Sequence, residues 1–80
     1  MEQDKTQYEV WILGYNEDDT VNDFEQLEAT FEDEDKAKWF ATHYPFSKPS
    51  ITPKAKVVVE EVTTDETGVP CVDVILETEL

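Results

Sequence analysis

The sequence has 80 residues, about half of the roughly 150 typical of one domain, so a single domain over residues 1–80 is expected. Apolar residues make up 39% of the chain, enough for one two-layer core but not for an enclosed cofactor pocket as well, and no cofactor is expected. Twenty Asp and Glu stand against six Lys and no Arg, giving a net charge of −14. This balance argues against direct binding to nucleic acid or to an anionic membrane, because both depend mainly on Lys and Arg.

Two further features of the composition limit the class of protein. No apolar run approaches the roughly 18 residues that span a bilayer, and the acidic first residues do not resemble a signal peptide. The single cysteine, Cys71, excludes an internal disulfide and a cysteine-based zinc cluster. We therefore expect a soluble domain in the cytoplasm.

The first expected strand is Tyr8–Tyr15, a run rich in aromatic and branched residues that follows a flexible tail over residues 1–6. Side chains alternate along a strand, so Val10 and Ile12 point to one side. The other side carries three large side chains: Trp11, Leu13 and Tyr15. Because both sides are apolar, this strand is expected inside the sheet.

A second strand is expected over Phe24–Phe31, after a polar connection at Asn16–Asp23. Its apolar residues Leu27, Ala29 and Phe31 alternate with polar ones, which is the period of a half-buried strand. The two strands are expected to form a hairpin with a long loop.

A helix is expected next, because four apolar residues recur with the spacing of one helix face: Ala37, Phe40, Ala41 and Tyr44. Asp33 is the expected N-cap, and Glu34 and Asp35 fall in the first turn, where the helix dipole favours carboxylates. Pro45 ends the helix. Residues 45–54 then form a proline-rich connector that Phe46 and Ile51 are expected to hold against the core.

The last two strands are expected over Lys56–Thr64 and Val69–Glu77, joined by a turn in which Gly68 takes a positive φ. Three apolar residues are expected on one face of the final strand: Val72, Val74 and Leu76.

These elements predict an α+β fold in the order β-β-α-β-β, a four-stranded antiparallel sheet with one helix on one face. The helix returns the chain so that the second and third strands are parallel. Placing the first strand between them makes all neighbours antiparallel, in the order 2-1-3-4. A single helix covers one sheet face only. Either the side with Val10 and Ile12 or the side with Trp11 is then left for the connector or a second subunit to cover.

The sequence contains no residue pattern that is typical of a catalytic site. The only histidine, His43, falls near the expected end of the helix, and Cys71 falls inside an expected strand, where a small buried thiol is usual. No local spacing pairs a nucleophile with a base, and Asp73 is expected to point outward between two valines without a partner. We therefore expect that the protein is not an enzyme.

The segment Asn16–Asp23 is rich in oxygen ligands, as a calcium-binding loop would be. An EF-hand loop beginning at Asn16 requires Gly at its sixth position and Glu at its twelfth, where this sequence has Val21 and Leu27. The motif fails, and no dedicated metal site is expected.

The charge is unevenly distributed along the chain. Residues 1–35 contain thirteen acids and one lysine, residues 36–56 five lysines and no acid, and residues 57–80 seven acids and no lysine. The acids could serve solubility alone, but a net charge of about 2–8 already achieves that in a small domain. Mutual repulsion destabilises a small fold, so the excess suggests a further use.

The first functional hypothesis is therefore a small acidic protein that binds a basic protein surface stoichiometrically, by analogy with nucleic-acid mimics, immunity proteins and antitoxins. Its candidate surface combines the first loop with the helix start: Glu17, Asp18, Asp19, Asp23, Glu32, Asp33, Glu34 and Asp35. The loop precedes the second strand and the helix follows it, so the two groups could lie at opposite ends of the sheet.

The alternative hypothesis is a homodimeric domain of unassigned role that associates through the uncovered apolar sheet face. Its candidate dimer face carries Trp11, Leu13 and Tyr15. The two hypotheses place the partner on different residues.

Overall fold

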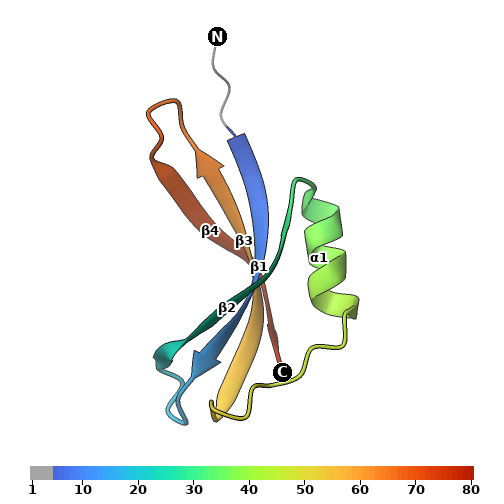
Figure 1. The fold of residues 1–80 in the computed structure, drawn as a ribbon, viewed down its shortest axis with the longest axis vertical. Helices are drawn as coiled ribbons and strands as arrows, with labels where there is room; N and C mark the ends of the chain where they lie inside the picture. Colours follow the sequence, from blue (N-terminus) through green and yellow to red (C-terminus); the bar gives the residue numbers. More distant parts are fainter. Residues whose placement is uncertain (1–4) are drawn as a thin grey trace.

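The computed structural model describes residues 5–80, which form four strands and one helix in the order β-β-α-β-β (Figure 1). The elements are β1 (Lys5–Tyr15), β2 (Val21–Phe31), α1 (Glu34–His43), β3 (Lys54–Thr64) and β4 (Pro70–Glu79). The strands form a single antiparallel sheet in the order β2-β1-β3-β4. The predicted α+β class, element order and strand order are all confirmed.

The strands are longer than the sequence pattern indicated. β1 begins at Lys5, so Lys5 and Thr6 lie in a strand and not in the expected tail, while residues 1–4 of that tail lie outside the described residues. β1 pairs with β3 along its whole length, from Lys5 opposite Thr64 to Tyr15 opposite Lys54. Because β1 is this long, its backbone can pair with residues of the neighbouring strands that lie beyond their apolar segments, so these strands are longer as well.

Local capping fixes both ends of α1. The Asp33 side chain accepts a hydrogen bond from the backbone N–H of Lys36 at 3.1 Å, as expected of an N-cap. At the other end, the Tyr44 N–H donates to the Phe40 carbonyl at 3.1 Å, and Pro45 follows. Tyr44 therefore lies beyond the last helical residue and is exposed. The prediction that it belongs to the buried helix face is wrong.

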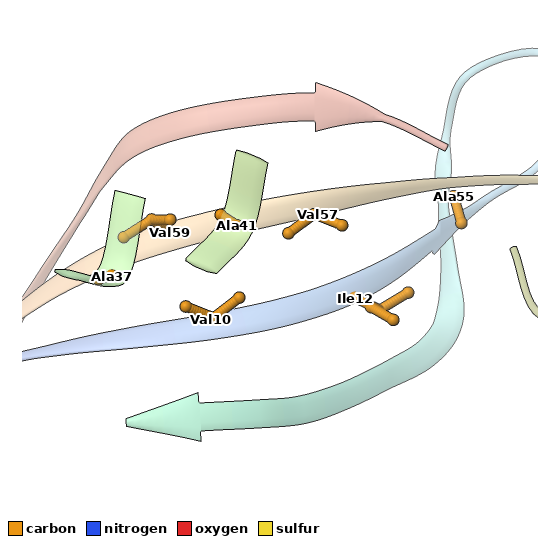
Figure 2. Packing of buried hydrophobic residues seen from close by; sticks show 7 residues of the cluster. All are labelled: Val10, Ile12, Ala37, Ala41, Ala55, Val57 and Val59. Carbon is orange, nitrogen blue, oxygen red and sulfur yellow. The ribbon is translucent and has the colours of Figure 1, made fainter. Parts of the chain in front are cut away.

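The core lies between α1 and the sheet face that this helix covers (Figure 2). Alanines on the inner side of α1 let the helix approach the branched residues of β1 and β3 closely. Seven buried residues form this cluster: Val10, Ile12, Ala37, Ala41, Ala55, Val57 and Val59. Of the two faces of β1 that the sequence left open, the side with Val10 and Ile12 is the one that the helix covers.

A bulge between β1 and β2 divides the apolar residues of β2 between the two sheet faces. Ala29 pairs with Val10, but after the shift Leu27 pairs with Trp11. Ala29 and Phe31 therefore face α1, whereas Leu27 lies on the opposite face and is exposed. The prediction that these three residues share one face is wrong, because one extra residue in a strand reverses the alternation.

A second bulge, between β3 and β4, has the same effect. Leu76 pairs with the core residue Val59, but Val74 pairs with Glu60. Val72 and Val74 consequently lie on the face opposite α1, while Leu76 packs against the core. The predicted common face of Val72, Val74 and Leu76 is also wrong.

The connector between α1 and β3 is held from the helix side. Phe46 packs edge-on against Phe40, with 5.4 Å between ring centroids, as expected. Ile51, expected to do the same, is 79% exposed. Its neighbour Thr52 is buried instead, and its hydroxyl lies 2.8 Å from both the Lys54 carbonyl and the Asn22 side-chain nitrogen. The connector is therefore anchored by the buried, hydrogen-bonded Thr52 and not, as the sequence predicted, by Ile51.

Two glycines are required by the backbone. A Cβ on Gly14 would lie 2.5 Å from the Asn22 Oδ1 atom and 2.8 Å from the Thr52 Oγ1 atom, so only glycine fits where the connector crosses β1. Gly68 has φ 87° in the turn between β3 and β4, as predicted.

Candidate functional site

The eight candidate acids form two separate groups, because residues 17–19 and 23 lie at the start of β2 and residues 32–35 follow its end. Figure 1 shows the course of β2 between these two ends. We call Glu17, Asp18, Asp19 and Asp23 the loop acids, and Glu32, Asp33, Glu34 and Asp35 the helix-start acids. An eleven-residue strand spans about 33 Å at about 3.3 Å per residue. The fold therefore does not bring the eight carboxylates together, and each group has to be considered with its own surroundings.

The loop acids are partly engaged within the protein. Asp18 accepts hydrogen bonds from the Thr20 hydroxyl at 2.6 Å and the Thr20 N–H at 3.1 Å, which lower the pKa of its carboxyl. Asp19, at φ 69°, forms an ion pair with Lys54 at 2.9 Å. The hydrogen bond to Asp19, with a smaller effect of Glu17, raises the pKa of the Lys54 ammonium. A lysine thus offsets part of the negative charge at this end of the sheet.

The helix-start acids divide by their role. Asp33 caps α1, and Glu34 pairs with Lys38 one turn later at 2.7 Å. Among residues 5–80, the carboxylates of Glu32 and Asp35 form no ion pair or side-chain hydrogen bond and are exposed to solvent. Two of the four acids are therefore available to an incoming cation.

The fold adds two acids to this group that lie far from it in the sequence. The Tyr8 hydroxyl donates to the Glu61 Oε2 atom at 3.3 Å. Desolvation is the largest cause that raises the pKa of this phenol, followed by the negative charges of Glu61, Glu34 and Asp33. Glu61 of β3 therefore lies near the helix start, and Asp73 of β4 pairs directly across from it. We define the helix-end acidic surface as Glu32, Asp33, Glu34, Asp35, Glu61 and Asp73.

The sequence did contain the information needed to find these two residues. The end of β2 and the end of β3 both pair with the start of β1: Tyr8 lies opposite Phe31 on one side and opposite Glu61 on the other. Applying the predicted strand order 2-1-3-4 to the positions of the acids would have placed Glu61 beside the helix start.

The sheet face opposite α1, here called the open face, carries the predicted dimer residues. Trp11, Leu13 and Tyr15 are half-buried there, and the Trp11 Nε1–H donates to the Glu9 Oε1 atom at 3.0 Å. The two bulges bring additional apolar side chains to this face, with exposed fractions of 47%, 53% and 51% for Leu27, Val72 and Val74.

Three carboxylates of the open face lie near Trp11: Glu9, Glu25 and Glu60. Glu9 and Glu60 lie directly opposite each other on β1 and β3. Desolvation, followed by the charges of Glu9 and Glu25, raises the pKa of the Glu60 carboxyl. The charged form of Glu60 is therefore less stable than the charged form of an ordinary surface glutamate.

The residues considered for catalysis remain apart from one another. Cys71 is exposed on β4, contrary to the expectation of a buried thiol, because β4 is an edge strand. His43 is exposed at the end of α1 and stacks on Trp39 at 4.6 Å between ring centroids. Within residues 5–80, no group of three or more His, Cys, Asp or Glu side chains is arranged to hold a metal ion.

Comparison with known proteins finds no matching family model, no matching curated protein and no matching solved structure. In the described part of the chain, no helix has the length and apolar character needed to cross a membrane.

Proposed function

We propose that this protein binds a basic protein surface stoichiometrically and that the helix-end acidic surface makes the contact. The supporting observation is the convergence of six carboxylates at one end of the sheet, where they come from the turn before α1, the first turn of α1, β3 and β4, and where α1 contributes two lysines, Lys36 and Lys38. The loop acids are the weaker candidate, because only four carboxylates gather there and one of them, Asp19, pairs with Lys54, which also lies within the field of Glu17.

The partner is a protein that presents a cluster of Lys or Arg side chains, such as the groove of a nuclease, a DNA-binding protein or a toxin. Duplex DNA carries one charge per about 1.7 Å of its axis, and carboxylates on adjacent strands and a helix end can present a comparable density. Binding of this kind needs no cofactor and no chemical step. Complementary charge mainly accelerates association, to about 10⁸ M⁻¹s⁻¹ or more at low salt, and added salt reduces that rate.

The partner can be isolated by pull-down from the host lysate at low and high salt. A basic protein that is recovered at low salt and lost above about 0.5 M salt has the expected electrostatic behaviour, because the Debye length falls to a few ångströms at high salt. The interface is then mapped with this purified partner by measuring association rates.

Two triple variants with the same change in charge distinguish the two acidic groups. Glu32→Gln/Asp35→Asn/Glu61→Gln neutralises the helix-end acidic surface and leaves the Asp33 cap and the Glu34–Lys38 pair intact. Glu17→Gln/Asp18→Asn/Asp19→Asn neutralises the loop. We expect the first variant to slow association at least about tenfold at low salt and to flatten its salt dependence, with a smaller effect of the second. If both variants associate at the wild-type rate with the wild-type salt dependence, the acids serve solubility and the proposal is wrong.

A further inference from the structure

The open face has a row of residues that crosses all four strands near its middle. Trp11 of β1 pairs with Leu27 of β2 and Val58 of β3, and Val58 pairs with Glu77 of β4. Val58 is buried although it lies on the side away from α1. The centre of the open face therefore already has an apolar floor, formed by Trp11 and Val58.

Charges on β3 are placed symmetrically about this row. Glu60 lies two residues from Val58 in one direction along β3, and Lys56 lies two residues from it in the other direction. Lys56 makes one long ion pair with Glu77, at 3.6 Å, and lies 4.8 Å from the centre of the Tyr15 ring. Glu60 faces Glu9 across the strands and has no ion pair among the described residues. The open face therefore carries a carboxylate without a cation on one side of the row and a loosely paired lysine on the other.

We propose that a second copy of this chain packs on the open face about a two-fold axis that crosses the strands at the Trp11–Val58 row. Rotation about that axis reverses the strand direction, so Glu60 of each copy faces Lys56 of the other, and Trp11 faces Trp11. An axis parallel to the strands would instead place Glu9 of one copy against Glu60 of the other. Charge complementarity therefore favours the first arrangement, in which the Glu60–Lys56 contact occurs twice by symmetry.

At full overlap, the open face reaches the lower end of the size range of specific dimer interfaces. Four strands about 4.8 Å apart and about 33 Å long present about 630 Å² per copy, so full overlap would bury about 1,300 Å² in total. Stable specific interfaces bury about 1,200–2,000 Å². Two twisted sheets of this kind pack about 10 Å apart with their strands rotated by about 30°. This rotation separates the outer strands, leaves Glu77 near solvent and reduces the buried area below the full-overlap value.

This dimer responds to salt in the opposite sense to the binding of a basic partner. Each copy carries a net charge of −14, so long-range repulsion opposes self-association at low salt. Added salt screens that repulsion, and we expect dimerisation to strengthen between about 0.05 M and 0.5 M salt. Burial and the neighbouring charges of Glu9 and Glu25 make the negative charge of Glu60 unfavourable. In the dimer, Lys56 of the second copy lies opposite Glu60 and offsets this charge.

Charge reversal at the two facing positions tests the axis. Sedimentation of the full chain at about 100 μM should show a dimer that Glu60→Lys and Lys56→Glu each weaken at least about tenfold, since each variant places like charges together twice. Mixing the two single variants should restore association as a heterodimer, and the double variant Lys56→Glu/Glu60→Lys should restore the homodimer. Glu66→Lys, the same charge change in the exposed β3–β4 turn, should leave the dimer intact.

The mixing experiment also excludes an effect of misfolding, because two chains that fail to fold would not rescue each other. The proposal is overturned if the wild-type chain sediments as a 9.2 kDa monomer at both salt concentrations. It is equally overturned if both single variants dimerise as the wild type does, or if their mixture remains monomeric.

Discussion

Replacing Phe40 with alanine tests the packing that joins α1 to the rest of the protein. The Phe40 ring contacts aromatic rings from β2, the end of α1 and the connector, with centroid distances of 5.5 Å to Phe31, 5.0 Å to Tyr44 and 5.4 Å to Phe46. Phe40 is half-buried. A fully buried phenylalanine costs about 3–5 kcal/mol when truncated, so partial exposure reduces the expected loss, while three ring contacts keep it substantial. We expect Phe40→Ala to lower the free energy of unfolding by about 2–3 kcal/mol.

Urea denaturation followed by far-UV circular dichroism measures this loss, at a concentration where the chain is monomeric. The matched control is Trp39→Ala, the adjacent position of the same helix, where the side chain is 61% exposed. We expect the control to cost less than about 1 kcal/mol. A loss below about 1 kcal/mol for Phe40→Ala, or equal losses for both variants, would show that α1 does not depend on this aromatic cluster.

Three other substitutions test separate parts of the fold, all by urea denaturation. Gly14→Ala should destabilise by about 2–3 kcal/mol because its Cβ has no room. Gly68→Ala, with no atom within 4 Å, should cost about 1 kcal/mol from its positive φ alone. Equal losses would contradict the close approach at Gly14. Thr52→Val should cost about 1–3 kcal/mol by leaving buried polar groups unpaired, and no loss would show that its hydroxyl is dispensable. Glu60→Gln should raise stability at neutral pH, because a carboxyl with a raised pKa binds its proton more tightly when folded. That gain should shrink as the pH falls through this pKa, and a gain that does not vary with pH would refute the assignment.

The strand order could be predicted because local signals and topology agree. Val10 and Ile12 on one side of β1, and Trp11, Leu13 and Tyr15 on the other, required a strand inside the sheet. Because the helix returns the chain, β2 and β3 run in the same direction, and only the order 2-1-3-4 then places β1 between them with all neighbours antiparallel. The caps of α1 were equally predictable, since Asp33 and Pro45 act on backbone groups only a few residues away.

The candidate site was predicted less well. Proximity in sequence grouped the loop acids with the helix-start acids, although β2 separates them. Glu61 was left out because almost thirty residues lie between it and Asp33, yet both lie within the electrostatic reach of Tyr8. Electrostatic interactions depend on distance in space, and β1 brings these two segments together.

The sequence by itself determined the elements of this protein, their order and which side of β1 is more aliphatic, because hydrophobic period and capping depend on neighbouring residues. Only the tertiary structure decided which face each side chain of the outer strands occupies. The bulges opposite Val10 and Val59 arise where paired strands accommodate different numbers of residues, and each reverses the alternation beyond it. Leu27, Val72 and Val74 were thereby moved to the open face, because pairing between distant strands, and not the pattern within one strand, sets the register.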